Sequence, residues 1–232
     1  MTAIPTQLTL GISLDDEARF ENFLVTERNQ QLVSELQSPD YAEPFLYFWS
    51  NASCGRTHLL QAICHEAGKR GASAIYLPLA NRDGFDPAIL EGAESLDLVC
   101  VDDVQLLAQD AQWEQALFNA FNAIKETNTC LIVTADTPPT NLQYALKDLQ
   151  SRMGSGLVYQ LQQLNDADKL DLLQLRARRR GIKLPGKVAD YILQRAERSV
   201  PALLNTLDKI DDSSLSQQRQ LTIPLVKSTM GW

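Results

Sequence analysis

The sequence predicts an α/β protein in which a five-stranded parallel sheet with helices on both faces is followed by a small all-helical lid. Two observations predict this fold class. Apolar, strand-like runs alternate with helical patterns up to Gln162, and such alternation is typical of a parallel sheet between two layers of helices. From Asn165 onward the strand-like runs stop and only helical patterns follow. We therefore expect an N-terminal segment of residues 1–14, a base of residues 15–162 and a lid of residues 163–232.

The expected strands are five short apolar runs bounded by polar or turn-forming residues. They cover residues 45–49, 73–77, 98–101, 130–134 and 157–161. The clearest helix between them is expected over 110–125, where apolar residues recur at helical spacing. In the lid we expect helices over 167–180, 185–198, 199–211 and from Thr222 to the end, separated by turns at Gly181, at Pro185 and around Ser213 and Ser214.

Composition excludes several classes of function. A net charge of −8 and a pI near 4.8 leave no broad positive surface, which argues against duplex DNA binding as the main activity. The four cysteines form no Cys-x-x-Cys pair and the chain has two histidines, so we expect free thiols in a reducing compartment and no zinc site. No run is apolar enough for a bilayer and no signal peptide is recognisable. We expect a cytoplasmic protein without membrane contact.

A polar turn after the first expected strand resembles the loop that cradles phosphates in nucleotide-binding proteins. Gly55 keeps the close approach of the backbone, and Thr57 keeps a hydroxyl for a magnesium ion. Backbone N–H groups and the following helix N-terminus can hold phosphate oxygens. The candidate nucleotide-binding loop consists of Ser50, Asn51, Ala52, Ser53, Cys54, Gly55, Arg56 and Thr57.

Two positions of this loop depart from the usual pattern of a glycine, four free positions and Gly-Lys-Ser/Thr. Ser50 stands where the first glycine belongs, and Arg56 stands where the lysine belongs. The planar fork of arginine is wider than an ammonium and cannot occupy the bridging oxygens in the same way. We expect phosphate binding to survive and turnover to suffer. Taken alone, the segment is equally compatible with an ordinary strand, turn and helix.

Acidic and polar residues follow two further strands. Asp102 and Asp103 end the third expected strand, where the first carboxylate can order magnesium and the second can orient a water. Thr134 and Asp136 end the fourth, which would place one of them near a terminal phosphate. The alternatives are an acidic turn for the pair and a turn-capping role for Asp136.

Two sets of arginines lie outside the loop. Arg152 follows Ser151 in a polar region before the last strand; it can be a solvated surface arginine or one that projects into a neighbour's nucleotide site. In the lid, we expect a solvated or partner-facing helix surface from the dense basic run. That run comprises Arg176, Arg178, Arg179 and Arg180.

Four signatures together resemble the AAA+ core of the bacterial initiator DnaA. They are Phe20-Glu21-Asn22-Phe23 with Asn29, Gly55-Arg56-Thr57-His58-Leu59-Leu60, Val101-Asp102-Asp103-Val104-Gln105, and Ser151-Arg152. The overall length, the loop arginine, Leu175-Arg176-Ala177-Arg178 and Leu221-Thr222-Ile223-Pro224 look closer still to the Hda family, the DnaA-related regulatory inactivators of replication initiation. The resemblance covers essentially the whole chain.

The resemblance implies a P-loop AAA+ base in an αβα sandwich, followed by a helical lid. It also implies a negative regulator that binds the DNA polymerase sliding clamp, the beta subunit, and stimulates ATP hydrolysis by DnaA. Initiators of this kind add a C-terminal DNA-reading module, and because this chain ends at Trp232 we expect no direct sequence-specific DNA binding.

Residue roles follow from the resemblance by position. Asn29, His58 and Asp136 join the loop in the nucleotide site, with Asp136 as the first sensor. Thr57 and Asp102 lie on the metal side, Asp103 is catalytic, and Arg152 is the arginine finger offered in trans to DnaA. The resemblance also gives the N-terminal segment a role, as the clamp-binding peptide of the family, carried by Gln7, Leu8, Leu10 and Ile12.

Such a peptide would bind in an extended form, with Gln7 fixing the register. Gly11 replaces a proline common in the family, which predicts weaker clamp binding because glycine raises the ordering cost by about 0.5–1 kcal/mol. The alternative is a tail without function.

The second departure from the family lies in the lid, where Pro201 takes the place of the second-sensor arginine. Proline fits the first turn of a helix but cannot report on a terminal phosphate. We expect an adenine nucleotide, ADP rather than ATP, with Mg²⁺ as a candidate partner ion, and homodimer formation stays open. The competing hypotheses are an autonomous loader-type ATPase that uses Asp103 and a DNA-binding initiator fragment, which the acidic charge disfavours.

Overall fold

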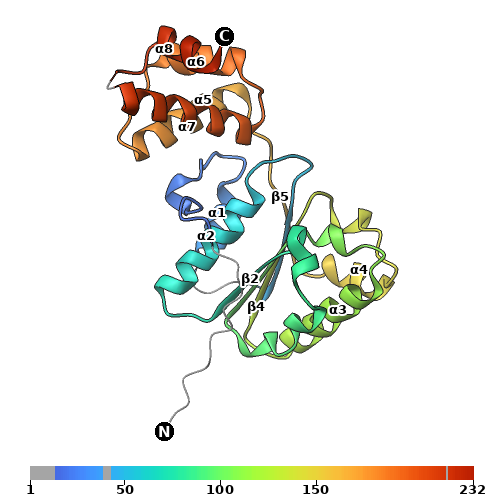
Figure 1. The fold of residues 1–232 in the computed structure, drawn as a ribbon. Helices are drawn as coiled ribbons and strands as arrows, with labels where there is room; N and C mark the ends of the chain where they lie inside the picture. Colours follow the sequence, from blue (N-terminus) through green and yellow to red (C-terminus); the bar gives the residue numbers. More distant parts are fainter. Residues whose placement is uncertain (1–13, 39–42, 218) are drawn as a thin grey trace.

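The computed structural model describes residues 14–38, 43–217 and 219–232, and it confirms the predicted fold class. Figure 1 shows a sheet between helices, with a separate group of helices beside it. The strands lie within one residue of their predicted positions and form one parallel sheet in the order β2-β3-β4-β1-β5. They are β1 (Phe45–Trp49), β2 (Ala74–Pro78), β3 (Leu98–Asp102), β4 (Cys130–Ala135) and β5 (Leu157–Gln160).

Both faces of the sheet are buried, and β3 and β4, which are buried along their whole length, are apolar except for Asp102 and Thr134 near their carboxyl ends. On one face, Tyr47, Val101 and Val133 pack with α3 (Ala111–Lys125) and α4 (Lys147–Met153). On the other, residues of alternate parity pack with α1 (Gln30–Gln37) and α2 (Arg56–Lys69), as Figure 1 shows. Because all the strand pairs are parallel, the five carboxyl ends lie at one edge of the sheet, which is where ligands bind in folds of this class.

The helix predicted over 110–125 begins where its sequence signal placed it. Asp110 is the N-cap of α3, and its carboxylate accepts a hydrogen bond from the Trp113 backbone N–H at 3.4 Å. Trp113, Leu117, Phe121 and Ile124 all turn into the sheet. Among the described residues, no helix is both long and apolar enough to cross a bilayer.

The lid consists of α5 (Asp166–Arg179), α6 (Gly186–Arg195), α7 (Val200–Gln217) and α8 (Ile223–Met230), which surround a hydrophobic cluster of their own. Two predicted boundaries were wrong. The helix predicted over 185–198 ends at Arg195, because its C-cap Ala196 has an extended conformation. The next helix begins shortly after, and the Ser199 hydroxyl accepts a hydrogen bond from the Ala202 N–H at 3.3 Å.

The turn predicted around Ser213 and Ser214 is also absent, and α7 continues through both residues. Serine favours turns when its hydroxyl competes with the backbone. Here the Ser213 hydroxyl instead accepts a hydrogen bond from Thr229 of α8 at 2.8 Å, and Ile210 anchors the preceding turn in the lid core. Tertiary contacts therefore outweigh the local turn preference.

Substituting Gly156 with alanine should destabilise the base by about 2 kcal/mol or more, because overpacking of a filled site forces the backbone to shift. A Cβ at Gly156 would lie 2.2 Å from the Phe45 carbonyl oxygen, at the start of the β1–β5 pair. Urea unfolding followed by circular dichroism measures the effect. The matched control is Gly68→Ala in α2, where a Cβ meets nothing within 4 Å and should stabilise the helix by about 0.5–1 kcal/mol. Equal midpoints for the two variants would contradict the packing argument.

Candidate nucleotide site

The turn between β1 and α2 is shaped by Gly55, the N-cap of α2, which has a left-handed conformation with φ of 95°. A Cβ at this position would lie 2.9 Å from Cε2 of Phe23, so both the backbone and the space require glycine. The N-terminus of α2, with N–H groups that the helix leaves without intrahelical partners, therefore lies at the carboxyl edge of the sheet. This is the geometry of an anion site.

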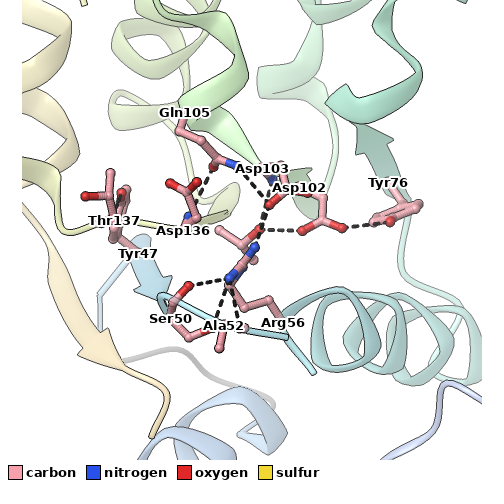
Figure 2. A network of polar contacts seen from close by, with 11 residues as sticks. Tyr47, Ser50, Ala52, Arg56, Tyr76, Asp102, Asp103, Gln105, Asp136 and Thr137 are labelled. Atoms are coloured by element: carbon pink, nitrogen blue, oxygen red, sulfur yellow. Dashed lines mark hydrogen bonds and ion pairs between the residues drawn. The ribbon is translucent and has the colours of Figure 1, made fainter. Parts of the chain in front are cut away.

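The loop arginine is held inside the loop rather than extended from it. Arg56 Nη1 donates to the carbonyl oxygen and, at 2.9 Å, to the hydroxyl of Ser50, while Nη2 donates to Oδ1 of Asp103 at 2.9 Å (Figure 2). Both partners of this ion pair are mostly buried, with side chains 15% and 24% exposed. Ser50, which replaces the usual glycine, is fully buried, and its carbonyl and hydroxyl oxygens hold the guanidinium of Arg56 in place.

Asp103 is held firmly in an unusual conformation. Its φ of 59° is uncommon for a residue other than glycine. Its N–H donates to the Thr134 hydroxyl at 3.0 Å, and its Oδ1 accepts from Gln105 at 3.1 Å in addition to Arg56. These bonds offset the backbone strain and fix the carboxylate against the loop arginine.

Asp102 is almost fully buried, with 3% of its surface exposed. Its carboxylate accepts hydrogen bonds from the hydroxyl of Thr134 and, at 3.0 Å, from that of Tyr76. Burial raises the pKa of Asp102, and the hydroxyls of Thr134 and Thr57 oppose the rise. The structure thus brings together the two side chains predicted for the metal side. No cluster of three or more potential metal-binding His, Cys, Asp or Glu residues occurs in the described ranges.

Asp136 lies beside this network at the end of β4. Its N–H donates to Oε1 of Gln105 at 3.2 Å, and its side chain is exposed (Figure 2). The neighbouring Tyr47 hydroxyl donates to the Thr137 carbonyl at 2.6 Å. Burial, with the nearby Asp136 charge, raises the pKa of Tyr47. Gln105 therefore links the first-sensor candidate to Asp103.

A cavity of about 450 Å³ opens between the loop, the N-terminal residues of the base and the lid. Of the predicted nucleotide-site residues, those that line it are Asn29, Ser53, Cys54, Gly55, Arg56, Thr57, His58, Asp103 and Pro201. Ser50, Asn51, Ala52, Asp102, Asp136 and Arg152 do not line it. A groove of about 850 Å³ beside α3 is larger, but its lining contains carboxylates and, among the described residues, no cation, so it does not suit phosphate.

Two of the lining residues shape the cavity through their neighbours. Asn29 accepts from the Thr26 N–H at 2.7 Å and donates to the Leu24 carbonyl at 3.0 Å, which fixes the turn that carries Leu24. The His58 ring nitrogen lies 2.8 Å from the Arg19 carbonyl oxygen. Burial lowers the pKa of His58, so the ring is neutral at pH 7 and fastens the N-terminal segment rather than binding phosphate.

Sequence reasoning missed the position of Arg176, which we predicted to lie on a solvated or partner-facing helix surface. It is 7% exposed, lines the cavity and pairs with Glu17 at 3.1 Å, because α5 packs against the short helix η1 (Phe20–Asn22). The helical spacing could have found it, since Arg176 lies one turn after Leu172 and Leu173 on the buried face of α5. Sequence reasoning also missed the apolar lining contributed by Phe23, Leu164 and Leu172.

Arg152 lies apart from the cavity, and its predicted surroundings were wrong. It belongs to α4 rather than to a polar turn, because Leu149 and Met153 anchor that helix in the core. Its guanidinium carbon lies 5.9 Å from the centroid of the Phe121 ring. Gln7, Leu8, Leu10 and Ile12 lie outside the described residues.

The cavity fits an adenine nucleotide in chemistry and size. Its volume falls within the range of small-molecule sites, roughly 300–1,000 Å³. Apolar side chains of Phe23 and Leu172 offer a surface for a base, while a helix N-terminus and the guanidinium of Arg176 suit phosphates.

Comparisons with known proteins agree with this geometry. Two family models match adjacent parts of the chain: "Bacterial DnaA ATPase domain" over residues 82–160 and "Hda, lid domain" over residues 166–230. Domain III of DnaA from Thermotoga maritima shares the fold with a TM-score of 0.79 at 19% identity, over 95% of this chain and 98% of that one.

Two further solved structures place the fold more widely. AMPPCP-bound DnaA from Aquifex aeolicus matches with a TM-score of 0.73 at 25% identity, over 88% of this chain and 68% of that one. RuvB from Thermotoga maritima, a Holliday junction branch migration motor, matches with a TM-score of 0.67 at 15% identity, over 92% of this chain and 71% of that one. The chain is therefore a DnaA-related AAA+ protein whose C-terminal helices match the lid of Hda.

Proposed function

We propose that this protein is a negative regulator of replication initiation that binds the sliding clamp and stimulates ATP hydrolysis by DnaA. The observation that carries the proposal is the match of residues 166–230 to the Hda lid, on a base whose catalytic carboxylate is paired with the loop arginine. The lid match points to a regulator related to DnaA, and the ion pair points to a protein that does not depend on its own hydrolysis. The division into residues 1–14, 15–162 and 163–232 is part of this proposal.

Nucleotide binding would involve the cavity described above. AMPPCP-bound DnaA supports an adenine nucleotide as the ligand class. Thr57 and Asp102 would hold a magnesium ion, which would supply charge neutralisation at the phosphates. Pro201 lines the cavity from the lid but carries no charge, and Arg56 is engaged with Ser50 and Asp103. Neither side chain therefore offers a free positive charge to a third phosphate. We therefore propose ADP as the preferred ligand.

Poor hydrolysis by the chain itself would follow from the Arg56–Asp103 ion pair. A general base must reach the proton that it removes and must be free to accept it. Oδ1 of Asp103 already accepts hydrogen bonds from Arg56 and Gln105. The retained Asp102 and Asp103 nevertheless favour a second candidate, an autonomous loader-type ATPase.

Action on DnaA would rest on Arg152. This residue lies on α4 and does not line the protein's own cavity, as a residue offered to another subunit requires. Its guanidinium would neutralise charge that develops on the phosphates bound by DnaA. Self-association is a separate expectation, which sedimentation velocity of the full chain tests.

Clamp binding is proposed for the segment containing Gln7, Leu8, Leu10 and Ile12. Deleting residues 1–12 should abolish retention on immobilised clamp, because the extended segment supplies the contacts. The far-ultraviolet circular dichroism spectrum and melting temperature should stay unchanged, since α1 to α8 are all retained. The substitution Gly11→Pro is the matched gain-of-binding variant and should bind more tightly. Unchanged retention of the truncated protein would contradict the tail assignment.

The whole function is tested by reconstitution. Purified ATP-bound DnaA, clamp loaded on DNA and this protein should together release phosphate faster than DnaA alone. Omitting the clamp, or using the protein without residues 1–12, should remove the acceleration. No acceleration by the complete mixture would contradict the proposed function.

A further inference from the structure

Arg176 is a buried cation in the lid that faces the candidate nucleotide cavity. It lies on α5, and its side chain is 8% exposed. Nη2 pairs with Oε2 of Glu17 at 3.1 Å, and Nε is buried without a hydrogen-bond partner in the described part of the chain. Burying a guanidinium N–H without a partner is costly. A ligand in the cavity would remove this cost.

The charge of Arg176 is only partly balanced. The Glu17 side chain is 53% exposed, so water screens it and the pair can open at low cost. Arg180, the C-cap of α5, adds positive charge nearby but has its own partner, Asp208. Burial and the neighbouring Arg180 charge lower the pKa of Arg176, while Glu17 raises it. The lid side of the cavity therefore favours an anion.

The other lining residues that could bind an anion are either engaged or uncharged. Both terminal nitrogens of Arg56 are engaged, with Ser50 and with Asp103. His58 is neutral and contacts the Arg19 carbonyl. Pro201, at the start of α7, brings no charge.

We propose that Arg176 is the phosphate-binding residue of the lid, and that Glu17 competes with the nucleotide phosphate for the same guanidinium. In the absence of ligand, Glu17 holds Arg176. A nucleoside diphosphate would replace that carboxylate with a charge-assisted, bidentate contact. The inference rests on the proposed nucleotide binding and adds the residue that supplies its charge.

The consequence is a link between the nucleotide and the N-terminal segment. Glu17 lies shortly before η1, and Arg179 of α5 donates to the Glu21 carbonyl at 3.1 Å. Release of Glu17 by a phosphate would remove one of the contacts between α5 and this segment. Loss of the Arg176 charge should therefore weaken nucleotide binding, whereas loss of the Glu17 charge should strengthen it.

Calorimetric titration of the full chain with adenosine, AMP and ADP tests the proposal. The substitution Arg176→Gln should weaken ADP binding about tenfold or more, because a charged hydrogen-bond donor is lost. Adenosine affinity should stay within about twofold, since no phosphate contact is involved. Arg176→Lys should recover part of the ADP affinity, because it keeps the charge but not the fork.

Glu17→Gln should bind ADP more tightly than the natural protein, because the competing carboxylate is removed. Arg178→Gln is the matched control, since Arg178 is an exposed cation on α5 that does not line the cavity, and it should leave ADP affinity unchanged. Melting curves without ligand show whether each variant is folded. If Arg176→Gln does not fold, the ADP affinity of Glu17→Gln still tests the proposal.

Three results would overturn the proposal. Equal losses of adenosine and ADP affinity in Arg176→Gln would mean that Arg176 only maintains the cavity. Unchanged or weaker ADP binding by Glu17→Gln would mean that Glu17 does not compete with the phosphate for Arg176. A natural protein that binds no ADP would contradict the proposed nucleotide binding itself, whereas normal ADP binding by Arg176→Gln would contradict only the role of Arg176.

Discussion

Replacing Arg152 with alanine should reduce the stimulation of DnaA hydrolysis by about a thousandfold or more, the range typical of an arginine finger. The reason is electrostatic, because the guanidinium would act where charge develops on the phosphates of the partner. Single-turnover hydrolysis by ATP-bound DnaA, with clamp and variant protein, measures the effect. Normal stimulation would remove Arg152 from the mechanism.

The same substitution should leave the fold and clamp retention intact. Arg152 is partly exposed, and its contact with the Phe121 ring contributes only about 0.5–1 kcal/mol. Lys147→Ala is the matched control, since Lys147 is an exposed cation on the same helix with a single hydrogen bond, to Gln150 at 3.4 Å. Arg152→Lys should be intermediate, because it keeps the charge but loses the bidentate fork.

Replacing Arg56 with lysine should increase ATP hydrolysis by the isolated protein by about a hundredfold, the lower end of what general bases contribute. Lysine restores the usual loop residue and removes the guanidinium from Oδ1 of Asp103. The freed carboxylate could then orient and deprotonate a water. Steady-state phosphate release by the purified chain measures the change.

The control for this prediction is the double variant Arg56→Lys with Asp103→Ala, which should return to the basal rate. ATP calorimetry on each variant separates hydrolysis from binding. If Arg56→Lys binds ATP but hydrolyses it no faster, the ion pair does not restrain the base. If instead the natural protein already hydrolyses ATP efficiently, and Asp103→Ala abolishes this, the loader-type ATPase is the better hypothesis.

The strands were predictable because their sequences are locally consistent. A strand such as β4, a mainly apolar run bounded by a turn, fits a central position in a sheet that is buried on both faces. The start of α3 was predictable for the same kind of reason, since Asp110 offers a cap next to an apolar stripe. Boundaries failed where a residue had two local options. Ser213 could turn the chain or continue the helix, and contact with α8 decided between them.

The residue types at the site were also predictable from the sequence, but the partners with which their side chains pair were not. The sequence alone showed an arginine in place of the loop lysine, and the resemblance placed a proline of the lid at the second-sensor position. Whether Arg56 extends into the cavity or folds back depends on Asp103, which belongs to another strand. The sequence interpretation of Arg176 failed similarly, because its partner Glu17 comes from the opposite end of the chain.

By itself, the sequence therefore determined the order of the elements, the residue types of the loop and the resemblance to DnaA-related proteins. These properties are local, since periodicity and turn chemistry act over a few residues. Only the tertiary structure decided which charges are paired, namely Arg56 with Asp103 and Arg176 with Glu17. The physical reason is that Coulomb attraction and burial depend on separation in space, which the fold sets and the order of residues does not.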